Sequence, residues 1–208
     1  MNRRLFLLGF VLLALGSSFG QAALVAAQEE LPAEPVLAPG TPLRLVQPRL
    51  GIDAPIVPVG VTEDGSMAAP TDPTTVGWWS LGVDAEPDGN VVLAAHVNWG
   101  GINRVFALLH LAEPGEVFYL TDAAGVEHGY LVTWVRSYDA NNAPLEEIFL
   151  PDAAGHQLTL ITCGGRYDAE NRQYLDRWVV RAQRIVHNPI EPSPDEAPPL
   201  EPESPPAP

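Results

Sequence analysis

Short runs of valine, leucine, isoleucine and aromatic residues alternate along the middle of the chain with turns rich in glycine, proline, aspartate and asparagine. Runs of this length and composition, bounded by such turns, predict β-strands. Together they indicate an all-β barrel or sandwich. The predicted strands span residues 43–47, 56–61, 90–97, 116–121, 129–138, 157–163 and 177–186, with a short additional strand at 66–69.

Helical spacing of apolar residues is clear in one place. Apolar residues recur at the interval of one helix face between residues 105 and 111, and Asn103 precedes them as a cap. A second, weaker helical pattern covers residues 143–149. The sequence therefore predicts a mostly β domain with one or two short helices.

The N-terminal residues differ in composition from this middle part. Arg3 and Arg4 precede an apolar run, and residues 1–27 predict an export signal. Two interpretations stay open, because the small residues 25–27 suit cleavage by signal peptidase, whereas the stretch 5–27 is long enough to remain as a membrane anchor. Both place the rest of the chain outside the cytoplasm, at the cell membrane or secreted.

Proline and acidic residues dominate the segments on either side of the expected domain. Residues 28–42 predict an extended spacer, and residues 188–208 predict a disordered acidic tail. Binding of a partner by this tail is an alternative to a plain solvated terminus. The remaining residues, 43–187, are long enough for one compact domain with its own core.

Charge and cysteine content narrow the classes of function. The 208 residues carry 11 basic and 26 acidic side chains, a formal net charge of −15, which argues against binding to nucleic acid through phosphate contacts. The single cysteine excludes an internal disulfide framework. No group of residues has the spacing of a zinc site or a calcium loop, so neither a metal nor another cofactor is expected.

Cys163 ends the predicted strand 157–163 and is followed by Gly164 and Gly165. Its thiol is therefore expected where a strand opens into a loop and where backbone can approach a ligand closely. A lone cysteine in an exported protein is a buried hydrophobic residue, half of an intermolecular bridge, or a working thiol. The cysteine by itself leaves these interpretations open.

His96 has a similar position near the end of the strand 90–97, on the same face as Val92 and Ala94. It is therefore the histidine that we expect beside a strand-end thiol. Four others are interpreted more simply as surface residues: His110, His128, His156 and His187.

An arginine is expected next to the cysteine on topological grounds. The strand that begins at Arg177 directly follows the strand that ends at Cys163, so the two are expected to pair antiparallel. Such pairing brings these two residues together at one rim of the sheet, about 5 Å apart across the ladder. Arg166 and Arg172 lie in the connecting loop and are the alternatives.

The segments around these residues match three motifs of one known family. Residues 159–163, Thr-Leu-Ile-Thr-Cys, resemble the T-L-x-T-C signature of sortases, the membrane-anchored cysteine transpeptidases of bacterial cell surfaces. Residues 177–182 resemble the strand that begins with the active-site arginine of that family, and Ala95-His96 stands in the place of its G-H pair. The resemblance covers nearly all of residues 43–186, and it is particularly to the class E and F branches.

Two positions depart from the family pattern. Ala95 replaces the more usual glycine, which should matter little where the backbone has negative φ. Some members of the class E and F branches place asparagine where Arg177 stands and use an arginine nearer the cysteine, which keeps Arg172 as the alternative.

The resemblance implies a closed β-barrel of about eight strands and a cysteine transpeptidase without a cofactor. It implies that the acyl donor is an L-P-x-T-G-like sorting peptide of a surface protein, cleaved between threonine and glycine as a thiol protease would cleave it. The acceptor would be an amine of a peptidoglycan precursor in the cell wall or of another surface protein such as a pilin.

The chemistry of amide exchange suits the same three side chains. An ionised Cys163 attacks a carbonyl and holds the acyl group as a thioester, while His96 protonates the departing amine and deprotonates the incoming one. Arg177 donates hydrogen bonds to the oxyanion, and the backbone N–H of Gly164 is a second candidate donor. Candidates for shaping the substrate pocket are Thr162, Trp78, Trp79 and Trp99.

Two other functions fit parts of the sequence. L,D-transpeptidases also use cysteine and histidine, but their cysteine stands in an S-H-G-C-x-R context that is absent around Cys163. A catalytically inactive surface adaptor that works through its proline-rich tail would tolerate loss of the thiol.

Overall fold

The computed structural model describes residues 37–85, 88–152 and 155–185. These residues belong to one compact unit, Val36–Pro208. The predicted export signal, the acidic tail and most of the spacer lie outside the described residues, as does His187. Within the described ranges, no helix has both the length and the apolar character needed to span a bilayer.

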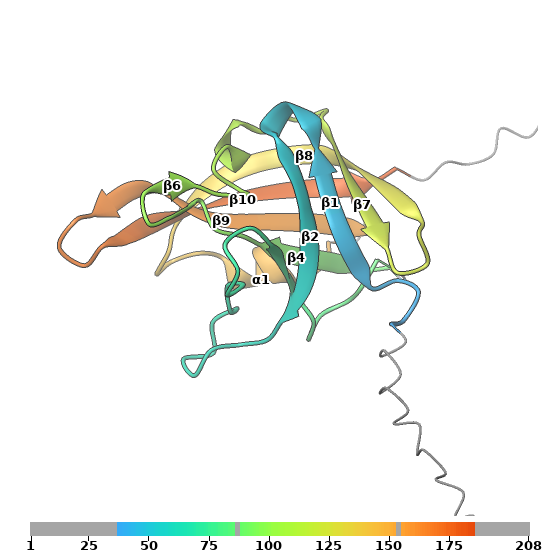
Figure 1. The fold of residues 1–208 in the computed structure, drawn as a ribbon, viewed down its shortest axis with the longest axis horizontal. Helices are drawn as coiled ribbons and strands as arrows, with labels where there is room; N and C mark the ends of the chain where they lie inside the picture. Colours follow the sequence, from blue (N-terminus) through green and yellow to red (C-terminus); the bar gives the residue numbers. More distant parts are fainter. Residues whose placement is uncertain (1–36, 86–87, 153–154, 186–208) are drawn as a thin grey trace, which may run out of the picture. The chain divides into compact units, whose positions relative to one another are not determined.

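Eight of the described strands close into a barrel in the order β1-β2-β3-β4-β9-β10-β8-β7 (Figure 1). The short strands β5 (Asn98–Trp99) and β6 (Ile102–Asn103) form a separate hairpin. The prediction of a closed all-β barrel is therefore confirmed. Its strands are β1 (Pro42–Gln47), β2 (Ile52–Val59), β3 (Val76–Trp79), β4 (Asn90–Ala94), β7 (Val117–Asp122), β8 (Glu127–Asp139), β9 (Gln157–Asp168) and β10 (Gln173–Arg184).

Alternation along each strand separates an inner from an outer face. On β9, Leu158 and Leu160 are completely buried, whereas Ile161 and Cys163 are partly exposed. Because successive side chains of a strand point to opposite faces, the cysteine belongs to the outside of the barrel. The large buried side chains of the core are Leu45, Ile52, Leu93, Phe106, Leu109, Phe118, Leu120, Tyr130, Leu158 and Leu160.

The strands on either side of the expected loop are longer than predicted. β9 continues to Asp168 and β10 begins at Gln173, so the two form one long hairpin with a tight turn. The prediction that Cys163 ends its strand is therefore wrong, because the ladder with β10 continues beyond it and Cys163 lies within β9. Figure 1 shows this hairpin extending beyond the barrel beside the β5–β6 hairpin. A hydrogen bond from Asn98 Nδ2 to the hydroxyl of Tyr174 links the two hairpins at 2.6 Å.

The strand β3 was not predicted, and the short strand predicted at residues 66–69 does not form. β3 has only four residues, Val-Gly-Trp-Trp, and pairs parallel with β2 and antiparallel with β4. So short a run shows little alternation, and its long-range pairing makes it a strand. Residues 66–69, predicted as a short strand, contribute a single bridge between Val61 and Met67.

The helix predicted between residues 105 and 111 does not form. Only a single 3-10 turn, η2 (Leu109–Leu111), is present. The N–H of Phe106 donates to the carbonyl of His96 (3.2 Å), and that of Leu109 donates to Phe106 (3.2 Å). Both Phe106 and Leu109 are buried in the core, so tertiary packing of these side chains overrides the helical pattern.

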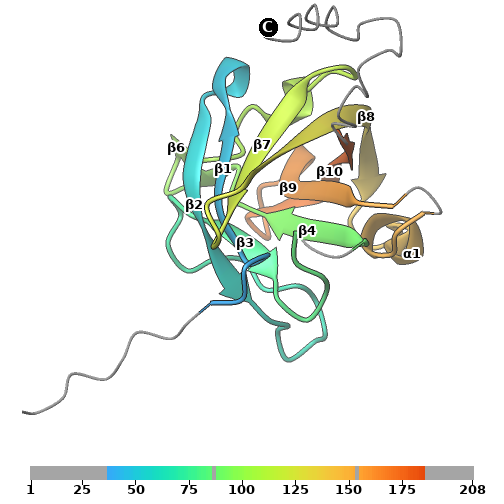
Figure 2. The same ribbon diagram turned by 90° about the vertical axis from the view of Figure 1, so that its right-hand side faces the viewer.

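The weaker helical pattern does form a helix. α1 (Leu145–Phe149) lies within the predicted residues 143–149. Figure 2 shows it on the outside of the barrel, beside the ends of β4 and β9. Another 3-10 turn, η1 (Pro48–Leu50), connects β1 to β2.

Candidate active site

Three neighbouring strands bring the predicted catalytic residues to one rim. β9 and β10 pair antiparallel with Cys163 directly opposite Arg177, which confirms the expected pairing of these strands. β4 pairs parallel with β9 as far as Ala94 opposite Ile161. Continuing that register by two residues places His96 beside Cys163, at the roughly 4.8 Å spacing of adjacent strands.

Hydrogen bonds maintain this register beyond the end of β4. The N–H of Ala95 donates to the carbonyl of Ile161 at 3.3 Å, and the hydroxyl of Thr162 donates to the carbonyl of Ala95 at 2.8 Å. Ala95 and Thr162 are both buried, whereas His96 and Cys163 are partly exposed. The histidine and the cysteine therefore share the outer face of the sheet.

The His96 imidazole is held by backbone and by an indole. Its Nε2 lies 2.9 Å from the carbonyl oxygen of Pro70. Because a carbonyl only accepts, Nε2 carries the proton, and in the neutral ring the lone pair is on Nδ1. The ring of Trp99 packs against the imidazole edge-on, with centroids 4.9 Å apart. The histidine is thus oriented as a base through Nδ1.

The Arg177 side chain is hydrogen-bonded to the backbone of its own strand. Its Nη1 donates to the carbonyls of Tyr174 and Asp176, both at 3.0 Å. These two bonds use one nitrogen of a guanidinium that has five N–H donors. Nε and Nη2 have no hydrogen-bond partner among the described residues, so they can serve a ligand next to Cys163.

The two alternative arginines have other surroundings. Arg166 binds Asp176 through Nε (3.0 Å) and Nη2 (2.6 Å), and its Nη2 also binds Asp139 at 2.8 Å. Arg172 is exposed in the β9–β10 turn with a positive φ of 54°. The five residues of ladder between Arg172 and Arg177, which is opposite Cys163, span about 16 Å at roughly 3.3 Å per residue. The structure therefore places Arg172 away from Cys163.

The two glycines after the cysteine allow close packing. A Cβ on Gly164 would lie 2.5 Å from Cδ1 of Trp178, and a Cβ on Gly165 would lie 2.5 Å from Oδ2 of Asp176. Gly165 also has a positive φ of 66°, which disfavours other residues. The backbone beside the thiol is thus shaped by an indole and a carboxylate.

The carboxyl group of Asp176, next to the rim, has a perturbed pKa. Hydrogen bonds from the Arg166 side chain and then from its backbone N–H lower the pKa of Asp176 from an ordinary value of 3.8 to about 2. The ionised form is therefore favoured in the folded chain. Its contribution to stability is complete above about pH 4 and is lost as the pH falls toward 2.

Replacing Asp176 with asparagine should lower the thermal stability of the chain at neutral pH. The difference in melting temperature between wild type and Asp176→Asn should shrink as the pH is lowered from about 4 to about 2, because the wild-type carboxylate then becomes protonated. Thermal unfolding of both proteins across this pH range measures the effect. A difference that does not change with pH would contradict the assigned role of the carboxylate.

The predicted pocket residues fall on two faces. Thr162 and Trp78 face the barrel interior: the Thr162 hydroxyl is bound to Ala95, and the Trp78 indole packs on the core with Nε1 donating to Val83 at 3.0 Å. They do not line the outer face, because adjacent residues on a strand point to opposite faces and their neighbours Cys163 and Trp79 point outward. Trp99 does lie beside His96.

Trp79, the neighbour of Trp78, reaches the outer face. Its ring packs edge-on against Phe149 of α1, with centroids 5.0 Å apart. Between this aromatic pair and the cysteine, the outer face presents Ala94 and Ile161, both partly exposed. The result is an apolar strip that leads from α1 to Cys163.

The interpretation of His128 as a surface residue is wrong. His128 is 3% exposed, and its Nε2 lies 2.8 Å from Oδ2 of Asp122. On the other side of the ring, Nη2 of Arg184 bonds to Nδ1. Pairing with a buried carboxylate allows a polar ring to be buried in the barrel wall. In contrast, His110 is exposed and His156 is partly exposed.

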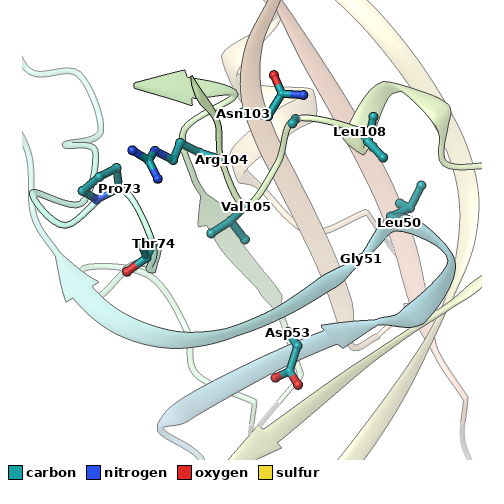
Figure 3. A pocket seen from close by; sticks show the side chains of 10 residues that line it. Leu50, Gly51, Asp53, Pro73, Thr74, Asn103, Arg104, Val105 and Leu108 are labelled. Carbon is teal, nitrogen blue, oxygen red and sulfur yellow. The ribbon is translucent and has the colours of Figure 1, made fainter. Parts of the chain in front are cut away.

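A hollow of about 430 Å³ lies on the side of the β1–β2 turn (Figure 3). Arg104 and Val105 line one side, and Pro73 and Thr74 line another. Neither Cys163 nor His96 is among its lining residues, so this hollow is separate from the rim that carries the thiol. Among the described residues, no three His, Cys, Asp or Glu side chains gather closely enough to hold a metal ion.

A thiol, an imidazole and a guanidinium on neighbouring strands of a closed barrel are an arrangement that can carry out cysteine-dependent acyl transfer. The family model described as the sortase domain matches residues 45–185. The chain therefore belongs to the sortase family and is a cysteine transpeptidase. Its place in class E or F stays a prediction.

Solved structures share the fold at low sequence identity. Sortase A from Corynebacterium diphtheriae, a lid mutant, is 22% identical with a TM-score of 0.53, covering 73% of this chain and 74% of that one. Sortase C1 from Streptococcus agalactiae is 17% identical with a TM-score of 0.51, covering 70% and 68%. Sortase C2 of Group B Streptococcus Pilus Island 1 is 22% identical with a TM-score of 0.53, covering 73% and 77%. No curated protein matches the chain.

Proposed function

We propose that this transpeptidase cleaves an L-P-x-T-G-like sorting peptide and transfers its acyl part, through a thioester on Cys163, to an amine. The observation that carries the proposal is the pairing of Cys163 with Arg177 on one side and the register that places His96 on the other. Nucleophile, acid-base group and cation are then neighbours on one outer face.

The reaction divides into two halves with balanced proton transfers. In the first, the Cys163 thiolate attacks the threonine carbonyl, and collapse of the tetrahedral intermediate breaks the C–N bond as protonated His96 gives its proton to the leaving amine. In the second, the incoming amine loses a proton to neutral His96 as it attacks the thioester, and the thiolate leaves. The hydrogen bond that Nε2–H donates to the carbonyl of Pro70 supports Nδ1 as the atom that exchanges these protons.

Arg177 is proposed to stabilise the negative charge that develops on the carbonyl oxygen. Its Nη1 is already bound to two backbone carbonyls, which restrains the guanidinium without using Nε or Nη2. A restrained donor in this position loses little entropy when charge develops in the transition state. The backbone N–H of Gly164, next to the thiol, is the second proposed donor.

The acyl donor is proposed to bind along the outer face between α1 and the thiol. Ala94 and Ile161 supply an apolar floor, and the Trp79–Phe149 pair supplies an aromatic side. Such a surface suits the leucine and proline side chains of a sorting peptide, because burying apolar groups contributes about 25 cal/mol per Å². The position of the threonine carbonyl then falls at Cys163.

The acceptor is proposed to be a primary amine of a peptidoglycan precursor or of another surface protein. One of the similar structures is named as a pilus-island enzyme, which supports a protein amine such as that of a pilin. Residues 1–27 are proposed to hold the chain at the cell membrane, with the catalytic domain outside the cytoplasm.

Mass spectrometry of the full chain tests this function. The chain is incubated with an L-P-x-T-G peptide library, first alone and then with glycinamide as the amine. We expect an acyl adduct on the peptide that contains Cys163, followed by an amide product in which glycinamide replaces the original leaving group. Hydrolysed peptide without any amide product would contradict transfer, and product without an adduct on Cys163 would contradict the thioester.

A further inference from the structure

The helix α1 ends above the outer face of the sheet and leaves several backbone carbonyls to be satisfied. The last carbonyls of any helix have no partner within it. In α1 the N–H groups of Ile148 and Leu150 donate to Pro144 (3.1 Å) and Glu146 (3.0 Å). The carbonyls of residues 147–150 therefore depend on partners outside the helix.

Arg181 of β10 supplies donors to most of these carbonyls. Its Nη2 donates to the carbonyl of Glu147, with a longer contact to Ile148 at 3.4 Å, and its Nη1 contacts the carbonyl of Leu150 at 3.5 Å. Nη1 also donates to Oε1 of Gln157. Arg181 is only 3% exposed, so its cation is committed to these internal acceptors.

Asn90 of β4 completes the set. Its Nδ2 donates to the carbonyls of Ile148 (2.8 Å) and Phe149 (3.2 Å). The hydroxyl of Thr159 donates to Oδ1 of Asn90 at 2.7 Å and so orients the amide. Every carbonyl from 147 to 150 thus has a donor from one of two sheet residues, Asn90 and Arg181, which we call the carbonyl clamp.

The carbonyl clamp and the proposed catalytic residues occupy opposite ends of one face. On β10, Arg181 and Arg177 are four positions apart, and His96, which continues the register of β4 past its end at Ala94, is six positions after Asn90. Even spacings on a strand place side chains on the same face. The clamp therefore determines how far α1 lies from Cys163 along the apolar strip.

The planar guanidinium of Arg181 suits a buried position that faces several backbone carbonyls. Burial lowers the pKa of Arg181, and the carboxylates of Asp152 and Glu147 oppose that shift. A planar guanidinium can reach several carbonyls at once, which an ammonium cannot, and Arg181 does so through Nη1 and Nη2, while its buried Nε has no hydrogen-bond partner in the part of the chain that the structure describes. The ring of Trp134, 5.6 Å from the guanidinium carbon, supports it from the side.

We propose that Arg181 and Asn90 are positioning residues that hold α1 as a preformed wall of the donor groove. The inference rests on the proposed function, because it assumes that the acyl donor lies between α1 and Cys163. A preformed wall spares the donor the entropic cost of ordering the segment 140–152 when it binds. The clamp then acts mainly on the affinity for the acyl donor, whereas Cys163, His96 and Arg177 carry out the chemistry.

Steady-state kinetics of the full chain tests this division. We expect Arg181→Gln to raise KM for the donor peptide about tenfold or more, with kcat at saturation and the rate of Cys163 alkylation by iodoacetamide within about twofold of wild type. Arg181→Lys should recover only part of the loss, because one ammonium replaces a fork of donors. A fall in kcat with unchanged KM would overturn the proposal.

Arg136→Gln is the matched control. Arg136 also contacts α1, but through an exposed ion pair with the Glu147 side chain and not through a backbone carbonyl. Exposed pairs of this kind contribute little, so the control should keep the wild-type KM. An equal rise of KM in Arg136→Gln would overturn the specific role of the clamp.

Hydrogen exchange gives a readout that needs no peptide. In Arg181→Gln the amides of Ile148 and Leu150 should exchange faster, while those of Leu160 and Val180 in the barrel core stay protected. If Arg181→Gln unfolds the barrel, Asn90→Ser takes its place and should show the same local exchange and a KM increase. Faster exchange of α1 with unchanged KM would overturn the proposal, since the wall would then not be used by the donor.

The two proposals can fail separately. If the wild-type chain forms no adduct on Cys163 with any peptide, the proposed function fails, and exchange at α1 still reports whether Arg181 holds the helix. If wild type forms the adduct and Arg181→Gln forms it with the wild-type KM, only the positioning role fails.

Discussion

Cys163→Ala will abolish acyl transfer and leave the barrel folded. The chain has a single cysteine, so no second thiol can replace the nucleophile. Cys163 lies on the outer face at the rim and not in the core, so removal of its sulfur leaves no internal cavity. We expect a loss of at least about 10⁴-fold in kcat/KM, the scale seen when a catalytic nucleophile is removed. Peptide turnover measures the loss of acyl transfer, and thermal unfolding of the same preparation shows whether the barrel stays folded.

Cys163→Ser sharpens the test, because it preserves shape and hydrogen bonding but supplies a far weaker nucleophile at neutral pH. It should be nearly as inactive as the alanine variant, and no peptide adduct should form at residue 163. If either variant keeps wild-type activity in cells, the result would support the catalytically inactive adaptor and contradict the catalytic role of the Cys163 thiol.

Arg177→Gln will lower kcat by about 10²- to 10³-fold, the typical loss when one oxyanion donor is removed. Glutamine keeps hydrogen-bonding capacity but has no charge, so it cannot stabilise the developing oxyanion to the same degree. Single-turnover formation of the Cys163 adduct is the step to measure. KM for the donor should change less than kcat, because the charge appears only in the transition state.

Arg172→Gln is the control that decides between the two arginines. Arg172 is exposed in the β9–β10 turn, whereas Arg177 is directly opposite Cys163. The Arg172 variant should therefore keep wild-type kinetics. Adduct formation that persists in Arg177→Gln and disappears in Arg172→Gln would transfer the role to Arg172, as in the branch members that place asparagine at the first position.

The strands and one contact of the site follow from local sequence. β9 and β10 are consecutive in the chain, so a hairpin was the simplest arrangement and it set Cys163 opposite Arg177. The alternation of apolar residues also placed most strands within a few residues of their true bounds. These features depend on neighbours in sequence, which is why the pattern contains them.

Other parts of the site depend on residues far apart in the chain. The sequence identified His96 as a strand-end residue, but its place beside Cys163 comes from parallel pairing of β4 with β9, and its tautomer from the carbonyl of Pro70. Likewise, the outward position of Trp79 follows from pairing of β3, a strand too short to show a pattern. Hydrophobic periodicity indicates which face of a strand each residue occupies, but it does not identify which distant strands pair.

The sequence by itself determined a β-rich domain, a lone cysteine on a predicted strand, and the motifs that relate it to sortases. Only the tertiary structure decided that the 105–111 segment is not a helix, that His128 is buried, and that α1 is clamped above the sheet by Asn90 and Arg181. The physical reason is that strand propensity and turn chemistry act over a few residues, whereas burial and long-range hydrogen bonds are fixed when the barrel closes.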